Sequence, residues 1–251
     1  MSADNISCLV GALDILFPDD PYFGGSTQGI QGDYKRHAVL IKLAQSLAHR
    51  GKLDILEVGS WTGCSTTTWA VTLGGMPQRG TITCVDPWKS YMTPHDESKG
   101  GLYPVMNRML DSGLAYALFL HNIKFISPEI GISHHVGTLG DVRSKLGYYD
   151  LIYLDGSHYY HDVVADIRHS HALLRDGGIL CGDDLEAQLH EVNVDWARAN
   201  LNSDFMADPS GTYYHPGVTL AVGERFGPVW SNLAVWAVRK TGDTYDKFDL
   251  K

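Results

Sequence analysis

Residues Leu53–Ser65, with the sequence LDILEVGSWTGCS, decide the fold, because an apolar strand runs directly into an acidic turn that carries two glycines. Gly59 and Gly63 remove side chains where the backbone must turn sharply and lie close to a ligand, and Ser65 can begin the next helix. The spacing Glu-x-Gly-x-x-x-Gly-x-Ser differs from the Gly-x-Gly-x-x-Gly of dinucleotide-binding folds, whose middle glycine makes room for a pyrophosphate. The loop therefore predicts a nucleoside site, with an ordinary strand-to-helix turn as the alternative.

A second short strand, Gly80–Asp86, ends in a carboxylate. An acid at this position can accept hydrogen bonds from both ribose hydroxyls of a bound nucleoside. Asp86 could instead be a turn or helix-cap acid, and its position relative to the glycine loop favours the ribose interpretation. Trp88 follows closely, and its ring could stack on adenine or cover the sheet edge.

Strands and helices alternate along the rest of the chain. Apolar residues recur at helical spacing between Asp33, a candidate N-cap, and Gly51, a candidate C-cap. The near-continuous apolar run Tyr149–Asp155 is typical of a strand in the middle of a parallel sheet. This rhythm predicts an α/β fold with a doubly wound, mostly parallel, Rossmann-like sheet, in which ligands bind at the carboxyl ends of the strands. Further strands are expected at Ile132–Val136, Ile179–Asp184 and Leu233–Val238.

The chain is expected to form one decorated domain. Residues 1–32 predict an N-terminal arm with a mobile lid, and Gln28–Gly32 would close over the ligand. Residues 33–240 predict the main domain, and residues 241–251 a C-terminal tail. Within the domain, residues 87–122 are too long for a simple connection, so they predict either a substrate cover or a crossover helix with a flexible entry.

Composition excludes several classes of function. The 251 residues include 20 basic and 29 acidic ones, a net charge of -9, which argues against a nucleic-acid binder because phosphate contacts need clustered Lys and Arg. Four widely separated cysteines indicate reduced thiols of a cytoplasmic protein. The sequence shows neither a secretion signal nor an apolar run that could span a membrane, so we expect no membrane partner. The apolar segment Cys8–Phe17 is a candidate surface for homo-oligomer formation.

Three carboxylates are expected to converge on the rim of this sheet. Asp155 ends the fourth strand, and Asp183 and Asp184 end the fifth. Neighbouring strands lie about 4.8 Å apart, so acids at their ends can reach a single ion. A hard divalent cation would offset this buried charge, and an all-oxygen ligand set favours magnesium, with manganese or calcium as alternatives. Alternatively, one Asp binds substrate hydroxyls and the others cap helices.

A histidine follows the first of these acids. His158 could take a proton from a substrate hydroxyl, because its ordinary pKa is about 6.5. It could instead make a polar contact at the start of the next helix or bind the ligand held by the glycine loop. Thr138, Leu139 and Asp141, which follow the third strand, lie where adenine would sit or are turn and cap residues.

These motifs together resemble class I S-adenosylmethionine-dependent methyltransferases, from about Asp33 to Val238. The glycine loop matches their first motif, and DGSHYY at 155–160, GGILCGDD at 177–184 and VDPW at 85–88 are similar to a subgroup that includes metal-dependent sugar and natural-product O-methyltransferases. The resemblance implies a seven-stranded sheet with an antiparallel C-terminal edge. It also implies that His158 is the general base, that the three aspartates bind the metal, and that Asp155 takes part in catalysis. The Asp-Asp pair varies the acid-Asp/Asn pattern of catechol-type enzymes. The residues expected to hold the methyl donor are Glu57, Gly59, Ser60, Trp61, Gly63, Ser65, Asp86, Trp88, Thr138, Leu139 and Asp155.

The expected activity is methyl transfer from S-adenosylmethionine to a hydroxyl of a small molecule such as a sugar, a glycan or a natural product, with magnesium as a second cofactor. One alternative is a nicotinamide-dependent oxidoreductase, which the glycine spacing and the absence of a Tyr-x-x-x-Lys pair after the fourth strand disfavour. A second alternative is a non-catalytic protein that binds the same donor. Isotope transfer from labelled donor to hydroxylated acceptors separates these possibilities.

Overall fold

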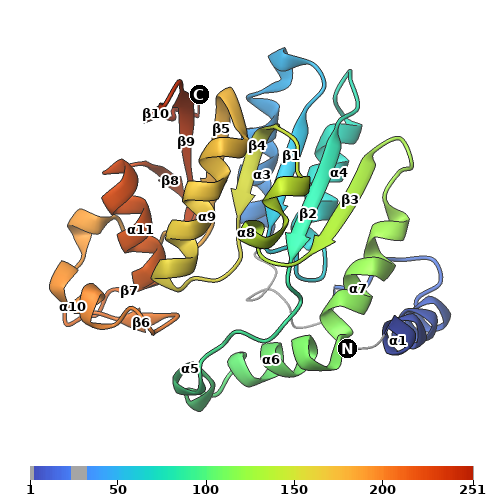
Figure 1. Ribbon diagram of the computed structural model, residues 1–251, viewed down its shortest axis with the longest axis horizontal. Helices are drawn as coiled ribbons and strands as arrows, with labels where there is room; N and C mark the ends of the chain where they lie inside the picture. The colour runs from blue at the N-terminus through green and yellow to red at the C-terminus, as the bar shows by residue number, and fades with distance from the viewer. Residues whose placement is uncertain (1–2, 24–32, 251) are drawn as a thin grey trace.

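A computed structural model describes residues 3–23 and 33–250 of the chain, which form an α/β fold around a central sheet (Figure 1). The first half contains α1 (Ala3–Leu16), α3 (Tyr34–Gln45), β1 (Asp54–Val58), α4 (Cys64–Gly74), β2 (Thr81–Asp86), α5 (Pro94–Ser98), α6 (Tyr103–Ser112), α7 (Leu114–Asn122) and β3 (Gly131–Val136). The second half contains α8 (Leu139–Val142), β4 (Tyr149–Leu154), α9 (Tyr160–Leu173), β5 (Leu174–Gly182), α10 (Val194–Ala199), β6 (Met206–Ala207), β7 (Tyr213–Tyr214), α11 (Pro216–Phe226), β8 (Trp230–Asn232), β9 (Val235–Thr241) and β10 (Thr244–Lys247).

The sheet has the order β10-β9-β5-β4-β1-β2-β3, and β8 pairs with β9 beside this path. Strands β1 to β5 are parallel, whereas β9 runs antiparallel to both β5 and β10. The predicted fold class, a mostly parallel doubly wound sheet with an antiparallel C-terminal edge, is therefore confirmed. The order changes direction at β1, between β4 and β2, and open α/β sheets bind ligands at such a point.

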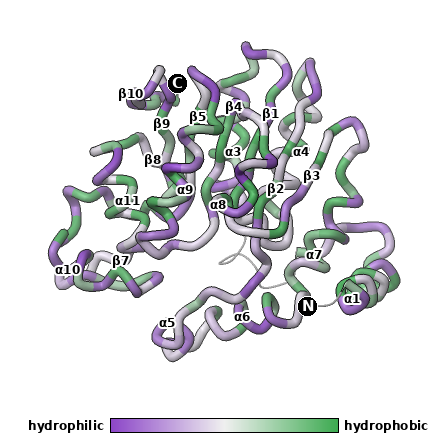
Figure 2. The backbone as a smooth tube through the Cα atoms, in the orientation of Figure 1, coloured by the Kyte–Doolittle hydropathy of each residue, from purple (hydrophilic) through white to green (hydrophobic). Residues whose placement is uncertain are grey.

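The central strands are apolar on both faces because helices cover both faces. In Figure 2 the strands form a hydrophobic centre between helices of mixed hydropathy. Ile55 and Leu151 pack toward α3 and α4 in one buried cluster, whereas Leu56 and Ile152 pack toward α9 and α11 in the other. Successive side chains of a strand point to opposite faces, so one apolar run supplies both cores.

Residues 87–122 fold into helices at the carboxyl end of the sheet. Helices α5, α6 and α7 lie beneath the strand tips in the orientation of Figure 1. Helix α1 packs on α7 through Leu13, Ala117 and Leu118, so the apolar N-terminal segment has a partner within the chain. The glycine-rich segment 24–32, which includes the expected lid Gln28–Gly32, lies outside the described residues.

Some boundaries differ from expectation. The helix after the glycine loop begins at Cys64 rather than Ser65, with Gly63 as its N-cap. Strand β5 begins at Leu174, before the expected turn, and its pairing with β4 is irregular between Tyr149 and Leu151. Within the segment expected as a tail, β10 pairs with β9. None of the helices among the described residues has the length and hydropathy that a membrane span requires.

The strand tips are held together by backbone contacts that leave no room for a side chain at residue 59. Gly59 donates its N–H to the carbonyl of Val85, at 2.8 Å, and has φ of 88°. A Cβ on this residue would lie 2.0 Å from the carbonyl oxygen of Asp155. The glycine therefore permits both the turn and the close approach of the β1 and β4 tips.

We expect Gly59→Ala to lower the free energy of unfolding by at least about 2 kcal/mol, because it adds a backbone clash to the cost of a left-handed conformation. Gly74→Ala is the matched control, since nothing lies within 4 Å of a Cβ there and the residue ends helix α4. Denaturant unfolding measures both variants. Equal stability of the two would show that the close approach at residue 59 is not required.

Candidate functional site

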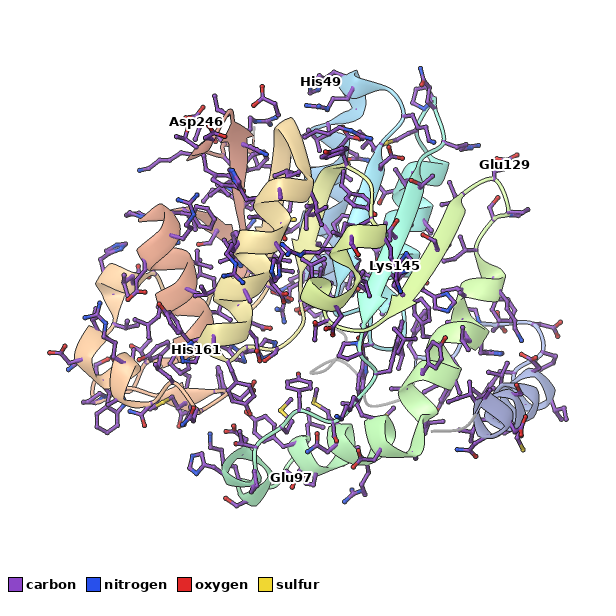
Figure 3. The ribbon with its side chains drawn as sticks, viewed as in Figure 1. His49, Glu97, Glu129, Lys145, His161 and Asp246 are labelled. Carbon is purple, nitrogen blue, oxygen red and sulfur yellow. The ribbon has the colours of Figure 1, made fainter. Side chains whose placement is uncertain are left out.

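A cavity of about 840 Å³ opens at the carboxyl ends of β1, β2, β4 and β5. The sheet forms one wall, and residues 99–103 with Met106, before and within the first turn of α6, form another. In Figure 3 side chains fill the space between the strand tips and the helices below them. The cavity lies at the change of strand direction, where the sequence predicts the ligand site.

The glycine loop and Asp86 form one end of the cavity. Gly59, Ser60, Trp61 and Ser65 line it. The carboxylate of Asp86 accepts hydrogen bonds from the backbone N–H groups of Trp61, at 2.9 Å, and of Trp88, at 2.6 Å. Burial raises the pKa of Asp86 to about 6, although these two donors act in the opposite direction. Each carboxylate oxygen keeps a lone pair, so Asp86 can still accept from a ligand.

Three residues expected to touch the donor lie behind the cavity wall instead. Glu57 is fully buried, and its carboxylate accepts from the hydroxyl of Thr66 and, at 3.1 Å, from the indole N–H of Trp69. Gly63 caps α4 with φ of 89°. Trp88 packs in the core and donates its indole N–H to the carbonyl of Trp61, at 2.7 Å. These residues support the loop rather than line the cavity, and the ring of Trp88 packs against Tyr116 and Phe119.

The turn after β3 forms the next part of the wall. Thr138 and Leu139 line the cavity, whereas Asp141 closes a capping box with Thr138 at the start of α8. Across from them, Asp166 of α9 also lines the cavity. Burial and the nearby Asp162 raise the pKa of Asp166 to about 7.

The three predicted aspartates come together at the ends of β4 and β5. The hydroxyl of Tyr153 donates to Asp155, at 3.1 Å, and also to Asp183, at 3.3 Å. Arg36 of α3 forms ion pairs with Asp183 and with Asp184, the latter at 3.1 Å. The sequence reasoning did not anticipate this arginine, which supplies a positive charge in the middle of the acidic group.

Burial and mutual repulsion shift the pKa values within this group. Burial, with Asp183 and Asp184 nearby, raises the pKa of Asp155 well above its ordinary value. Burial and the charge of Asp184 raise the pKa of Asp183 to about 6, although Arg36 opposes the shift. Burial alone would raise the pKa of Asp184, but the charges of His158, His215 and Arg36 hold it below its ordinary value. Asp184 is therefore the member of the group that stays ionised most readily.

His158 lies between two carboxylates. Its Nε2 is 2.9 Å from Asp184, and its Nδ1 is 2.9 Å from Asp204. Burial would lower the pKa of His158, but the charges of Asp184 and Asp204 raise it well above the ordinary value. Both ring nitrogens therefore carry protons in this arrangement.

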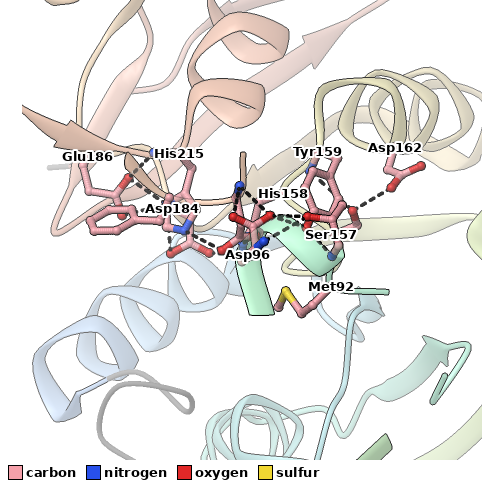
Figure 4. Close-up of polar contacts among 12 residues, drawn as sticks. Met92, Asp96, Ser157, His158, Tyr159, Asp162, Asp184, Glu186 and His215 are labelled. Atoms are coloured by element: carbon pink, nitrogen blue, oxygen red, sulfur yellow. Dashed lines mark hydrogen bonds and ion pairs between the residues drawn. The ribbon is translucent and has the colours of Figure 1, made fainter. Parts of the chain in front are cut away.

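A second histidine stands beside the first. The ring of His215, just before α11, lies 4.5 Å from the ring of His158, and its Nδ1 is 3.0 Å from Glu186 (Figure 4). The backbone N–H of Asp204 donates to the buried Asp96, which also accepts from the hydroxyl of Tyr159, at 2.7 Å. The polar network thus continues from the strand tips to helix α5.

Sequence reasoning missed Arg36, Asp204, Glu186 and His215, although all four line the cavity. Arg36 lies within an ordinary amphipathic helix, and Asp204 and His215 lie in a polar region with no periodic pattern. Glu186 follows the Asp183-Asp184 pair by two residues. Of the four residues, it alone could have been assigned to the site from its closeness in sequence to a predicted site residue.

Comparison with known proteins identifies the family. A family model described as a methyltransferase domain matches residues 56–185, which is about half of the chain. No curated protein sequence matches the chain.

Solved structures give weaker similarities. One is a Corynebacterium glutamicum protein, with 16% identity, a TM-score of 0.47, and 96% of this chain and 91% of that chain covered. A second is CalS11, the TDP-rhamnose 3'-O-methyltransferase of calicheamicin biosynthesis, with 16% identity, a TM-score of 0.44, and 95% and 96% covered. A third is an O-methyltransferase from Bacillus cereus in complex with SAH, with 14% identity, a TM-score of 0.36, and 74% and 68% covered.

The matched segment runs from β1 through the glycine loop, Asp86 and His158 to the Asp183-Asp184 pair, and so includes most of the cavity wall. The resemblance stated from the sequence is confirmed: the chain belongs to the methyltransferase domain family and is a class I S-adenosylmethionine-dependent methyltransferase.

Proposed function

We propose that this protein transfers the methyl group of S-adenosylmethionine to a hydroxyl of a small molecule. The observation that carries the proposal is one continuous cavity that joins the glycine loop and Asp86 to Asp155 and His158. The glycine loop and Asp86 suit a nucleoside, and Asp155 and His158 suit a hydroxyl that must lose a proton. A cavity of about 840 Å³ is within the size range of pockets for small molecules.

The donor would occupy the end of the cavity beside β1 and β2. Its ribose hydroxyls would donate to Asp86, and the backbone of Gly59 and Ser60 would lie along its amino-acid portion. Leu139 would contact the adenine, with Thr138 at its edge. Glu57, Gly63 and Trp88 would act indirectly, because they hold the loop from behind.

The acceptor would lie beside His158. A methyl transfer from a sulfonium needs an in-line oxygen nucleophile and a group that removes its proton. An acceptor hydroxyl that enters between His158 and Asp184 would replace their 2.9 Å contact, while Asp204 keeps its hold on Nδ1. Loss of the contact with Asp184 would lower the pKa of His158, so its Nε2 proton would leave to solvent. The Nε2 of the neutral ring then faces the hydroxyl, with the ring orientation fixed by Asp204, and Asp155 lies next to the same space.

The three aspartates fit a divalent cation by their chemistry. Asp155 and Asp184 offer oxygens that lie, with a ring nitrogen of His158, within 4.8 Å of one another, and the hydroxyl of Tyr153 joins Asp155 to Asp183. Carboxylate oxygens are the ligands that magnesium prefers. Arg36 holds two of the three carboxylates, so it would have to turn away from Asp183 and Asp184 when a cation binds. A bound cation would lower the pKa of an acceptor hydroxyl and orient it.

The affinity for S-adenosylmethionine is expected to fall by about tenfold between about pH 7 and pH 5. Asp86 has a pKa of about 6 in the free protein, and its charged form is the better acceptor for ribose hydroxyls. A proton must therefore leave Asp86 when the donor binds below pH 6, which weakens binding as the pH falls. Calorimetry across this range measures the effect, and Asp86→Asn should bind weakly with a flatter profile. An unchanged profile in that variant would assign the pH dependence to another group.

His158→Gln should lower kcat by about 10²–10⁴-fold while donor affinity stays close to that of the wild type, because a general base contributes a factor of this size. The matched control is His161→Gln, three residues further on and exposed (Figure 3). Transfer of labelled methyl to a panel of hydroxylated acceptors gives the rate, and calorimetry gives the affinity. A fall of both quantities in His158→Gln would indicate misfolding instead of a lost base. Donor binding by the wild type without transfer to any acceptor would favour the non-catalytic alternative.

Chelation should lower the turnover of the wild type, and added magnesium should restore it. Asp155→Ala and Asp184→Ala should lose this stimulation and retain donor binding, because Asp86 and the glycine loop are untouched. Turnover that is equal with and without a chelator would contradict the magnesium proposal and leave Arg36 as the cation that balances Asp183 and Asp184.

A further inference from the structure

Two histidines and a carboxylate face one another at the end of the cavity away from the glycine loop. His158, Asp204 and His215 present ligand atoms that all lie within 4.8 Å of one another, and all three residues line the cavity. The Nδ1 of His158 is 2.9 Å from one oxygen of Asp204, and the Nε2 of His215 is 3.8 Å from the other. Ligands around a tetrahedral ion with bonds of about 2.0–2.1 Å are separated by about 3.3 Å. The three residues already offer ligand atoms within 4.8 Å of one another, so a closure toward that separation would let them surround an ion.

The nitrogen of each histidine that faces away from this centre has its own carboxylate. The Nε2 of His158 is 2.9 Å from Asp184, and the Nδ1 of His215 is 3.0 Å from Glu186 (Figure 4). Metal-binding histidines in proteins usually donate the second N–H to a carboxylate, which fixes the ring and raises its basicity. Both histidines here have that arrangement, which a simple surface pair would lack.

We propose that His158, Asp204 and His215 form a transition-metal site, with zinc as the preferred ion. Two imidazoles and one carboxylate suit zinc or iron better than magnesium, which prefers oxygen. Three protein ligands would leave a fourth position open toward the cavity. The site differs in its ligands from the proposed magnesium site, which rests on Asp155, Asp183 and Asp184, and the two adjoin where His158 contacts Asp184.

Zinc at this position would inhibit methyl transfer, a consequence that rests on the proposed function. An ion on the Nδ1 of His158 takes the place of the proton shared with Asp204, and that proton leaves to solvent. The neutral ring then carries its remaining proton on Nε2, where it donates to Asp184. An acceptor hydroxyl would then meet a protonated nitrogen, Nε2–H, which cannot accept a proton. Protein with zinc bound therefore cannot deprotonate the acceptor through His158.

The test begins with zinc binding to the full chain, freed of metal, and does not depend on turnover. Calorimetry is expected to show one zinc per chain, and X-ray absorption at the zinc edge should show nitrogen and oxygen ligands with the outer-shell signal of imidazole. His215→Gln and Asp204→Asn should each weaken zinc by about 100-fold or more, and Glu186→Gln by about tenfold. His161→Gln should bind zinc as the wild type does. Circular dichroism of each variant checks that it is folded.

Three results would overturn the proposal. Zinc affinity that Asp183→Asn lowers and His215→Gln does not would place the ion among the aspartates. A sulfur shell at about 2.3 Å would place it on a cysteine, such as the exposed Cys8. Binding that none of the three site variants weakens would show an adventitious ion only.

The inhibition is measured separately. With magnesium in excess, zinc should suppress methyl transfer by the wild type, and His215→Gln should need about 100-fold more zinc for the same suppression. Stoichiometric zinc that leaves turnover unchanged would overturn the inhibitory role. Absence of any methyl transfer would instead count against the proposed function, because the binding measurements stand without it.

Discussion

The site depends on the balance of charge at the carboxyl ends of β4 and β5. Asp155, Asp183 and Asp184 are brought together by the pairing of these strands, and their charge is removed from most of the solvent. A buried carboxylate is costly unless a positive group or hydrogen-bond donors accompany it. In this protein Arg36, His158 and Tyr153 accompany the three acids, and each comes from a different part of the chain.

This balance connects the two ends of the cavity. At one end Asp86 is held by the backbone N–H groups of Trp61 and Trp88. At the other end the carboxylates are held by side chains that can exchange partners. A fixed acceptor suits a donor that must bind in one orientation, whereas an adjustable polar network suits the proton movement that the proposed reaction requires.

The sequence was sufficient to predict the fold because its strongest signals are local. The strand before Gly59 and the run at 149–155 are apolar on both faces, and both are central strands in the structure. The same reasoning placed Asp155, Asp183 and Asp184 on one edge, since the parallel pairing of successive strands fixes where their ends meet. It could not place β10, because an edge strand of mostly exposed residues carries no apolar pattern.

The partners of the acids lay beyond sequence reasoning for another reason. Arg36 reaches Asp183 from an N-terminal helix, and His215 reaches the site from the opposite end of the chain. Contacts at such separations follow from the complete packing of helices on the sheet, and a single residue type in a helix does not reveal them. Trp88 shows a different difficulty. The sequence placed this residue just after the end of β2, but the motif suited two orientations of its ring, and only the structure shows that the ring packs in the core.

The position of β9 has a consequence for how the protein is made. It lies between β5 and β10, so the sheet stays incomplete until residues 235–247 have left the ribosome. His215 and α11 also follow β5 in the chain. The nascent chain can therefore assemble the nucleoside half of its fold early, while the acidic tips of β4 and β5 have Arg36 and His158 at hand and gain His215 later.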